Sequence, residues 1–166
     1  MGELTVHVGF VRTSTKGAFS EKKKDTVAAV VQSLRRWFDG KNGFDTESLF
    51  PKRIGLKDPF GYAVTCDGRE CFRLSFDGEE PFRIREEDGC FEAKFRIDGV
   101  LPEQPELRET ALENLFGFLS FGRRSTNPRF YFSELRVNGI FIRVPDRLDA
   151  SIDQVRVLFM EAALKE

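Results

Sequence analysis

The amino-acid sequence predicts an α+β domain in which an antiparallel β-sheet packs against three helices. Two observations carry this prediction. Apolar residues recur with helical spacing in three segments, over residues 25–40, over residues 105–121 and after Ser151. Between these segments the pattern changes to alternation, with Asp-Gly or Asn-Gly pairs at the turns, which is typical of antiparallel hairpins. The expected order is helix, meander, helix, hairpin and helix.

Length and composition fit a single domain over residues 1–166. Apolar residues make up 40% of the chain, enough for a core without metal or disulfide support. The 26 Lys and Arg residues balance 27 Asp and Glu residues, so attraction to nucleic acid or anionic lipid needs a local patch. The sequence shows no apolar run of the roughly 18 residues that a membrane span needs, and no secretory leader pattern. We therefore expect a cytoplasmic protein without membrane association.

Residues 1–20 are expected to form an N-terminal strand or arm, because residues 4–12 alternate and the next ones contain Ser, Thr and Gly. The first helix follows, with Asp25 as a candidate N-cap and Gly40 at its end. Residues 40–60 have no sustained period and are interpreted as an inserted loop. The apolar stripe of the helix consists of Val27, Val30, Val31, Leu34 and Trp37 or Phe38.

A meander is predicted after residue 60, where the apolar period changes to two. Asp-Gly pairs at 67–68, 77–78 and 88–89 separate its strands. Phe, Leu and Ile at alternate positions share one face, which we expect to line the core. The predicted strands are Gly61–Cys66, Arg69–Phe76, Phe82–Arg85 and Cys90–Asp98.

The second helix is expected from Pro105 to Phe121, ended by Gly122. Its apolar residues cover most of the circumference of the helix, so the helix is either buried on more than one side or placed in a subunit interface. A hairpin follows, with Asn138-Gly139 as its turn. The last helix begins near Ser151, where Ser151 and Gln154 form a capping box.

Residues that usually carry catalysis or bind metals are few. Cys66, Cys71 and Cys90 are odd in number, and the first two are spaced C-x4-C, unlike zinc knuckles or redox motifs. His7 is the only histidine and lies in an alternating segment. We find no nucleophile elbow and no phosphate-binding loop. The sequence therefore predicts no metal site, no cofactor and no enzymatic activity.

The outward positions of the meander are rich in basic residues. One hypothesis is a surface for nucleic acid or phosphate. The other is an ordinary solvent face, whose charges are balanced by acids such as Glu79, Glu80, Glu86 and Glu87 in the turns. The candidate anion-binding residues are Arg73, Arg83, Arg85, Lys94 and Arg96.

Four segments of the sequence resemble the class I type III secretion chaperones. Residues Cys66–Leu74 are similar to the first hairpin of that family. Phe91–Ile97 is similar to its third strand, and the following Gly99-Val100-Leu101-Pro102 is similar to the entry to its middle helix. Leu112–Gly117 falls where that helix carries dimer contacts. Leu135–Val144, continuing into Pro145–Asp149, is similar to the closing hairpin and the acidic lead into the last helix.

This resemblance implies a small cytoplasmic homodimer that holds an extended segment of a secreted effector protein by apolar patches and strand addition, without a cofactor. The same α/β sandwich also suits an immunity-type inhibitor of a toxin. The residues expected to contact the partner are Trp37, Phe38, Phe72 and Leu74. The residues expected in the dimer interface are Leu115, Phe116, Phe118 and Phe121.

Overall fold

The computed structural model describes residues 2–48, 61–76, 81–120, 130–144 and 152–165. These residues form three helices and eight strands, all paired antiparallel, which confirms the predicted α+β class. The elements are β1 (Glu3–Arg12), α1 (Phe19–Phe38), β2 (Phe44–Ser48), β3 (Gly61–Cys66), β4 (Arg69–Phe76), β5 (Phe82–Ile84), β6 (Phe91–Val100), α2 (Pro105–Leu119), β7 (Phe130–Val137), β8 (Ile140–Ile142) and α3 (Ile152–Leu164).

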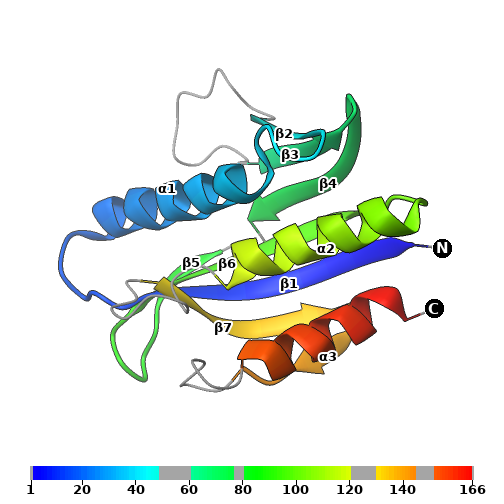
Figure 1. Ribbon diagram of the computed structural model, residues 1–166. Coiled ribbons are helices and arrows are strands. Elements are labelled where there is room, and N and C mark those ends of the chain that lie inside the picture. The colour runs from blue at the N-terminus through cyan, green and yellow to red at the C-terminus, as the bar shows by residue number, and fades with distance from the viewer. Residues whose placement is uncertain (1, 49–60, 77–80, 121–129, 145–151, 166) are drawn as a thin grey trace.

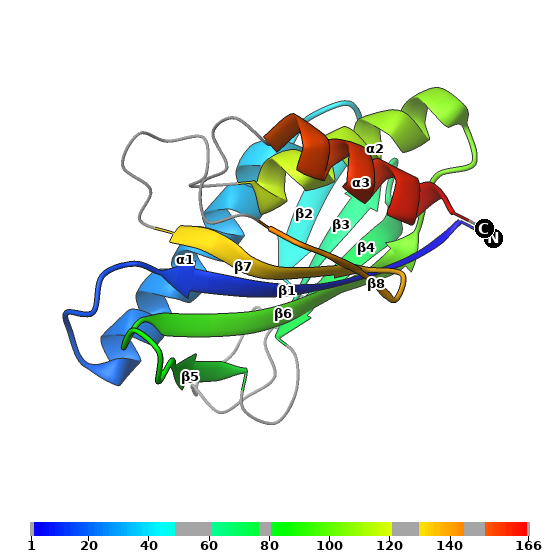
Figure 2. The ribbon, with the colours of Figure 1, turned by 90° about the horizontal axis from the view of Figure 1, so that it is seen from below.

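The strands form one sheet in the order β2-β3-β4-β6-β1-β7-β8, and β5 pairs with β6 outside this path. Both β4 and β5 lie along the same side of β6, because β1 occupies its other side. β4 pairs with the second half of β6 and β5 with its first residues. The β3–β4 hairpin therefore diverges from β5, as Figure 2 shows.

The N-terminal segment forms a central strand. All ten residues of β1 pair with β6 on one side, and most of them pair with β7 on the other. Leu4, Val6, Val8 and Phe10 are buried, so every second residue contributes to the core. The alternating N-terminal segment therefore lies in the middle of the sheet, a position that an arm would not occupy.

The three helices cover one face of the sheet, with α2 between α1 and α3 (Figure 1). This position explains why α2 is apolar around most of its circumference, since it contacts both neighbouring helices and, through Phe118, the ring of Phe95 on the sheet. At its contact with α1, a Cβ added to Gly117 would lie 2.6 Å from the Trp37 ring. The two helices can approach this closely only because residue 117 has no side chain.

Helix α1 begins six residues before the expected cap. Ala18 is its N-cap, and Asp25 lies inside the helix, where its Oδ2 accepts a hydrogen bond of 2.7 Å from Nε of Arg12. Residues 20–25 are polar, so they carry no apolar period, although Glu and Lys favour helix. Lys22 and Thr26 are buried although they lie outside the predicted stripe.

Two of the predicted hairpin turns have type I′ geometry, whereas Asp88-Gly89 ends a longer loop, in which Gly89 has a φ of 71° and its N–H donates to the carbonyl of Arg85 at 2.9 Å. Asp67 and Gly68 have φ values of 52° and 80°, and Asn138 and Gly139 have values of 49° and 82°, as a type I′ turn requires. Val137 pairs with Ile140 across the second turn. The 77–78 turn and Ser151 lie outside the described residues. Within the expected 40–60 loop, Phe44–Ser48 form the edge strand β2.

Candidate protein-binding edges of the sheet

The residues expected to contact a partner belong to the core of the single chain. Phe38, Phe72 and Leu74 are buried, and the rings of Phe38 and Phe72 pack 6.2 Å apart. Trp37 is partly buried and packs against Gly117 of α2. The sequence pattern marked these residues as apolar, but it did not show that three helices and one sheet are enough to cover them. They therefore do not form an exposed contact surface.

The residues expected in a dimer interface are also covered within one chain. Leu115, Phe116 and Phe118 are buried, because α2 lies between the two other helices. The ring of Phe116 lies 5.5 Å from that of Phe159 on α3, and the ring of Phe118 lies 5.9 Å from that of Phe95 on β6. Phe121 lies outside the described residues. The apolar circumference of α2 is thus explained by packing within the chain.

The basic residues of the meander are largely paired with acids. This agrees with an ordinary solvent face, since each guanidinium has a carboxylate of the same chain beside it. Lys94 is exposed on β6. The ion pairs are Arg73–Glu70 at 2.8 Å, Arg83–Glu92 at 2.9 Å, Arg85–Glu87 at 3.0 Å and Arg96–Asp98 at 2.6 Å.

The cysteine thiols lie in environments that keep them protonated. Burial, with the neighbouring Cys66, raises the pKa of the Cys71 thiol from its ordinary 9.0 to about 11. Burial also raises the pKa of Cys66 and that of Cys90. Protonated thiols are weak nucleophiles and poor metal ligands. The part of the chain that the structure describes contains no group of three or more His, Cys, Asp or Glu residues able to hold a metal ion.

The first exposed apolar surface surrounds β5, and we call it the β5 edge: Phe19, Phe76, Phe82, Ile84 and Phe91. Phe19 is 48% exposed and Ile84 is 41% exposed, whereas Phe91 is fully buried. The ring centroids of Phe19 and Phe91 lie 5.3 Å apart, those of Phe91 and Phe82 6.0 Å, and those of Phe82 and Phe76 5.1 Å. A chain of ring contacts therefore leads from the exposed Phe19 to the buried Phe91 and on to the partly buried Phe82 and Phe76.

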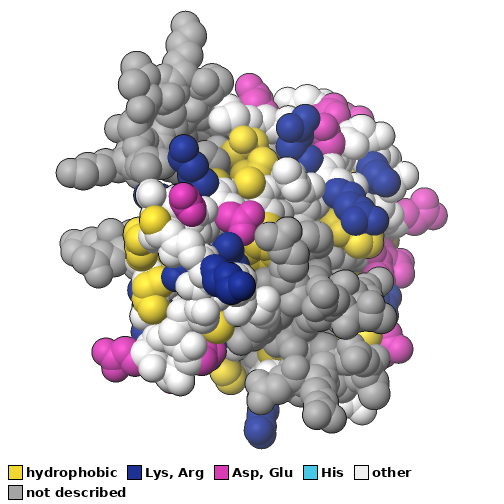
Figure 3. Space-filling model, turned by 90° about the vertical axis from the view of Figure 1, so that its left-hand side faces the viewer, with side chains coloured by type: hydrophobic (Ala, Val, Ile, Leu, Met, Phe, Trp, Pro, Cys, Tyr) yellow, Lys and Arg dark blue, Asp and Glu magenta, His cyan; other side chains and the backbone are white. Residues whose placement is uncertain are grey.

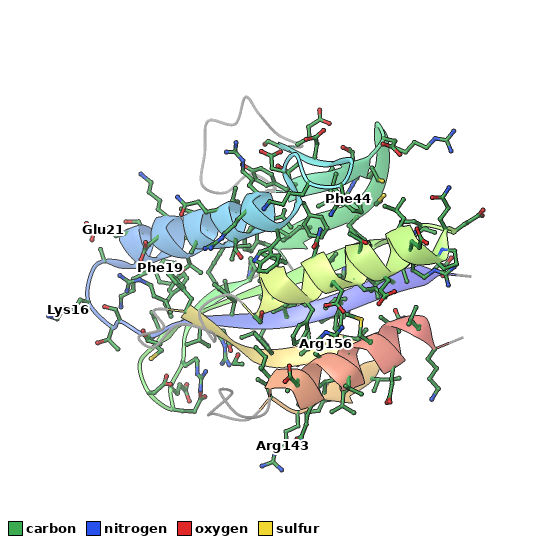
Figure 4. The ribbon with its side chains drawn as sticks, in the orientation of Figure 1. Lys16, Phe19, Glu21, Phe44, Arg143 and Arg156 are labelled. Atoms are coloured by element: carbon green, nitrogen blue, oxygen red, sulfur yellow. The ribbon has the colours of Figure 1, made fainter. Side chains whose placement is uncertain are left out.

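Phe19 lies in the first turn of α1, at the left-hand end of the molecule in Figure 4. Figure 3 shows this end facing the viewer. On this face, hydrophobic side chains lie among Lys, Arg, Asp and Glu. Nζ of Lys23 is 4.7 Å from the centroid of the Phe82 ring, within the range of a cation–π contact. The surface is therefore aromatic with a cationic border.

The backbone of β5 presents hydrogen-bonding groups at the side away from β6. The N–H of Lys94 donates to the carbonyl of Pro81 at 2.7 Å, and the N–H of Arg85 donates to the carbonyl of Cys90 at 2.8 Å. Because antiparallel bonds alternate along a strand, Phe82 and Ile84 direct their N–H and C=O groups away from β6. β5 pairs with β6 alone among the described strands. Within the described residues, the outward backbone groups of Phe82 and Ile84 have no strand beside them, so an added strand could pair with these two residues.

The opposite face of β5 is polar and internally balanced. Arg83 donates to Oε1 of Glu92, and Oγ of Ser133 donates to Oε2 of Glu92 at 2.9 Å. Glu92 is only 5% exposed, so both of its oxygens are satisfied within the sheet. The two faces of the β5 edge thus differ, with aromatic rings on the helix side and a closed ion pair on the other.

The second exposed apolar surface lies at the far end of the sheet, and we call it the β8–α3 edge: Ile140, Phe141, Val157, Leu158 and Leu164. These are five of the eight large apolar side chains that are exposed in the described residues, and Phe141 is the most exposed at 60%. α3 packs over β7 and β8 (Figure 1). The edge therefore has an apolar strand and an apolar helix face in adjacent layers.

Sequence reasoning did not single out either edge. Phe19 fell in the N-terminal segment expected to be a strand or arm, which removed it from the helix pattern. A signal for the second edge was present in Ile140–Ile142, because three consecutive apolar residues place apolar side chains on both faces of a strand. A hairpin with one wet face would alternate instead.

Comparison with known proteins gave no significant match to a family model, to a curated protein or to a solved structure. None of the described helices is long and apolar enough to cross a membrane.

Proposed function

We propose that this protein is a non-enzymatic binding protein of the chaperone kind, which holds an extended segment of a partner protein at the β5 edge. The observation that carries the proposal is the outward-directed backbone of Phe82 and Ile84, beside the exposed side chains of Phe19 and Ile84 and the partly buried ring of Phe82. Strand addition uses this combination, because backbone bonds give affinity and alternate side-chain contacts give selectivity. The resemblance to type III secretion chaperones favours the same activity.

The geometry defines the chemistry of the bound segment. Every second side chain of an added strand lies on the helix side, where it meets Phe82, Ile84 and Phe19. The intervening side chains lie on the side of Arg83 and Glu92, which already neutralise each other. The preferred segment is therefore extended, with apolar residues at alternate positions and polar residues between them.

Short synthetic peptides of this alternating pattern test the proposal by fluorescence anisotropy. We expect Phe19→Ser and Ile84→Lys each to weaken peptide binding about tenfold. Phe141→Ser, at the other edge, is the matched control and should leave binding unchanged. Circular dichroism shows whether each variant is folded. If wild-type protein binds none of the alternating peptides, or if the variants bind as well as the wild type, the proposal fails.

N-methylation of the peptide backbone tests strand addition itself. Methyl groups on alternate amides block one edge of an extended peptide, and a shift by one residue blocks the other edge. We expect one of the two methylated peptides to lose binding and the other to retain it. Equal binding by both would show that the segment is held by side chains alone.

A further inference from the structure

We infer that the β8–α3 edge binds a second copy of this chain, with β8 pairing antiparallel to β8 of the copy about a two-fold axis at Phe141. This inference does not depend on the proposed function. A two-fold contact requires a surface that is complementary to itself. The backbone, the side chains and the charges of this edge meet that requirement.

The backbone direction follows from the turn. In a two-residue type I′ hairpin the residues that flank the turn form a hydrogen-bonded pair, here Val137 and Ile140. Bonds alternate along the strands, so Arg136 and Phe141 form a pair without such bonds. The N–H and C=O groups of Phe141 therefore point away from β7. Two copies related by the axis exchange both of these bonds.

The side chains match in this register. Phe141 lies opposite Phe141 of the second copy, and an aromatic pair across two strands is stabilising. Ile140 of one copy lies opposite Ile142 of the other. Arg143 is exposed and points away from the molecule (Figure 4), and its position in the copy is opposite Gly139, which has no side chain to repel it. No charged residue faces a like charge.

The helix layer extends the same contact. The side chain of Arg156 is directed to Glu113 on α2 (Figure 4), with Nε and Oε2 3.0 Å apart. Leu158 is two residues later, about 200° further round the helix, so it lies on the side away from α2 and toward the open edge. Glu161 lies on this side of the helix near Leu158, and Lys165, of opposite charge, follows the last residue of α3. In the dimer, the two copies of α3 therefore contact each other through Leu158. The nearby charges, on Glu161 and Lys165, are of opposite sign and do not repel the second copy.

The other edge strands lack this property. Self-pairing of all three residues of β5 would place Arg83 opposite Arg83 of the copy. Self-pairing of β2 about Thr46 would place Asp45 opposite Glu47 of the copy. Like charges directly opposite each other are destabilising. Among the described edge strands, β8 is therefore the one whose residues accept their own copy.

Light scattering across a range of protein concentrations tests the inference. We expect a mass near 38 kDa, twice the 19.0 kDa of the chain. Phe141→Lys and Leu158→Glu should each raise the dimer dissociation constant about a hundredfold. Ile84→Lys, a change of equal kind at the β5 edge, should leave the mass unchanged. A wild-type monomer at every concentration would overturn the inference, as would a Phe141→Lys variant that stays dimeric.

Cysteine cross-linking tests the register directly. Residues opposite each other in a hydrogen-bonded pair have Cα atoms about 5.5 Å apart, which suits a disulfide. Phe141→Cys should therefore give a covalent dimer under a mild oxidant, seen on a non-reducing gel. Arg143→Cys is the control, because its two copies are displaced along the strands by about 13 Å. Efficient linkage at 143 and none at 141 would contradict the register.

Discussion

The β5 edge and the β8–α3 edge are open borders of one sheet, but their apolar residues are anchored differently. At the β5 edge, the exposed Phe19 packs on Phe91, which is fully buried. At the β8–α3 edge, Phe141 lies on the face of the sheet away from the helices, where Arg136 is its cross-strand neighbour. An anchored aromatic surface can present a fixed site to segments of differing sequence. An exposed ring without such an anchor, like that of Phe141, gains most from a partner that covers it.

The largest expected difference between the edges is in stability. Phe91→Ala removes a buried ring that joins the β5 edge to the core, so we expect a loss of about 3–5 kcal/mol. Phe141→Ala removes an exposed ring and should cost about 0.5 kcal/mol or less. Urea unfolding, at a protein concentration low enough to avoid self-association, measures both. Similar losses for the two variants would show that the anchoring does not differ.

Secondary structure and the register of the closing hairpin were largely predictable because they depend on local signals. Asn138-Gly139 specified both a turn type and the Val137–Ile140 pair, since few residues accept positive φ at both central positions. The limits of β3 and β4 were also predicted, because period-two alternation ends at Asp67-Gly68. The early start of α1 was missed, since its first residues are polar.

The sites were less predictable because exposure is a tertiary property. Phe72 and Phe141 both lie in apolar strand segments, yet one is buried under α1 and the other is the most exposed large apolar residue described. Nothing within either segment shows which strand lies at the border of the sheet. The central position of β1 was missed for the same reason, since alternation gives the faces of a strand but not its neighbours.

A smaller effect concerns the polar face of the β5 edge. Glu92→Gln keeps the shape of the side chain but removes the charge that pairs with Arg83 and accepts from Ser133, so we expect a loss of about 1–2 kcal/mol. Arg83→Gln should cost less than about 1 kcal/mol, because the Arg83 side chain is half exposed. Urea unfolding measures both variants. If Arg83→Gln costs more than Glu92→Gln, the exposed partner rather than the buried one stabilises the pair.

Cys71, near the turn of the β3–β4 hairpin, belongs to neither binding surface and provides an internal control. The folded chain holds the Cys71 proton more tightly than the unfolded chain, because the pKa rises from 9.0 to about 11 on folding. The resulting stability is fully present below pH 9 and is lost as the pH rises toward 11. Thermal unfolding should therefore show a falling Tm in this range, and Cys71→Ala should reduce the fall. An unchanged slope in that variant would assign the fall to other groups.

Salt has the smallest expected effect, and it separates apolar recognition from recognition by charge at both edges. Between about 50 and about 200 mM salt, peptide binding and self-association should each change less than about threefold, because both contacts rest on backbone bonds and apolar side chains.

The binding of a ligand held by four phosphate contacts, for example on Arg73, Arg83, Arg85 and Arg96, would weaken about a hundredfold over the same range. These guanidinium groups already lie against carboxylates, so a phosphate would have to displace Glu70, Glu92, Glu87 and Asp98. Anisotropy titrations at the two salt concentrations measure the difference. A steep salt dependence at the β5 edge alone would mean that Lys23, beside the Phe82 ring, contributes more to recognition than the rings do.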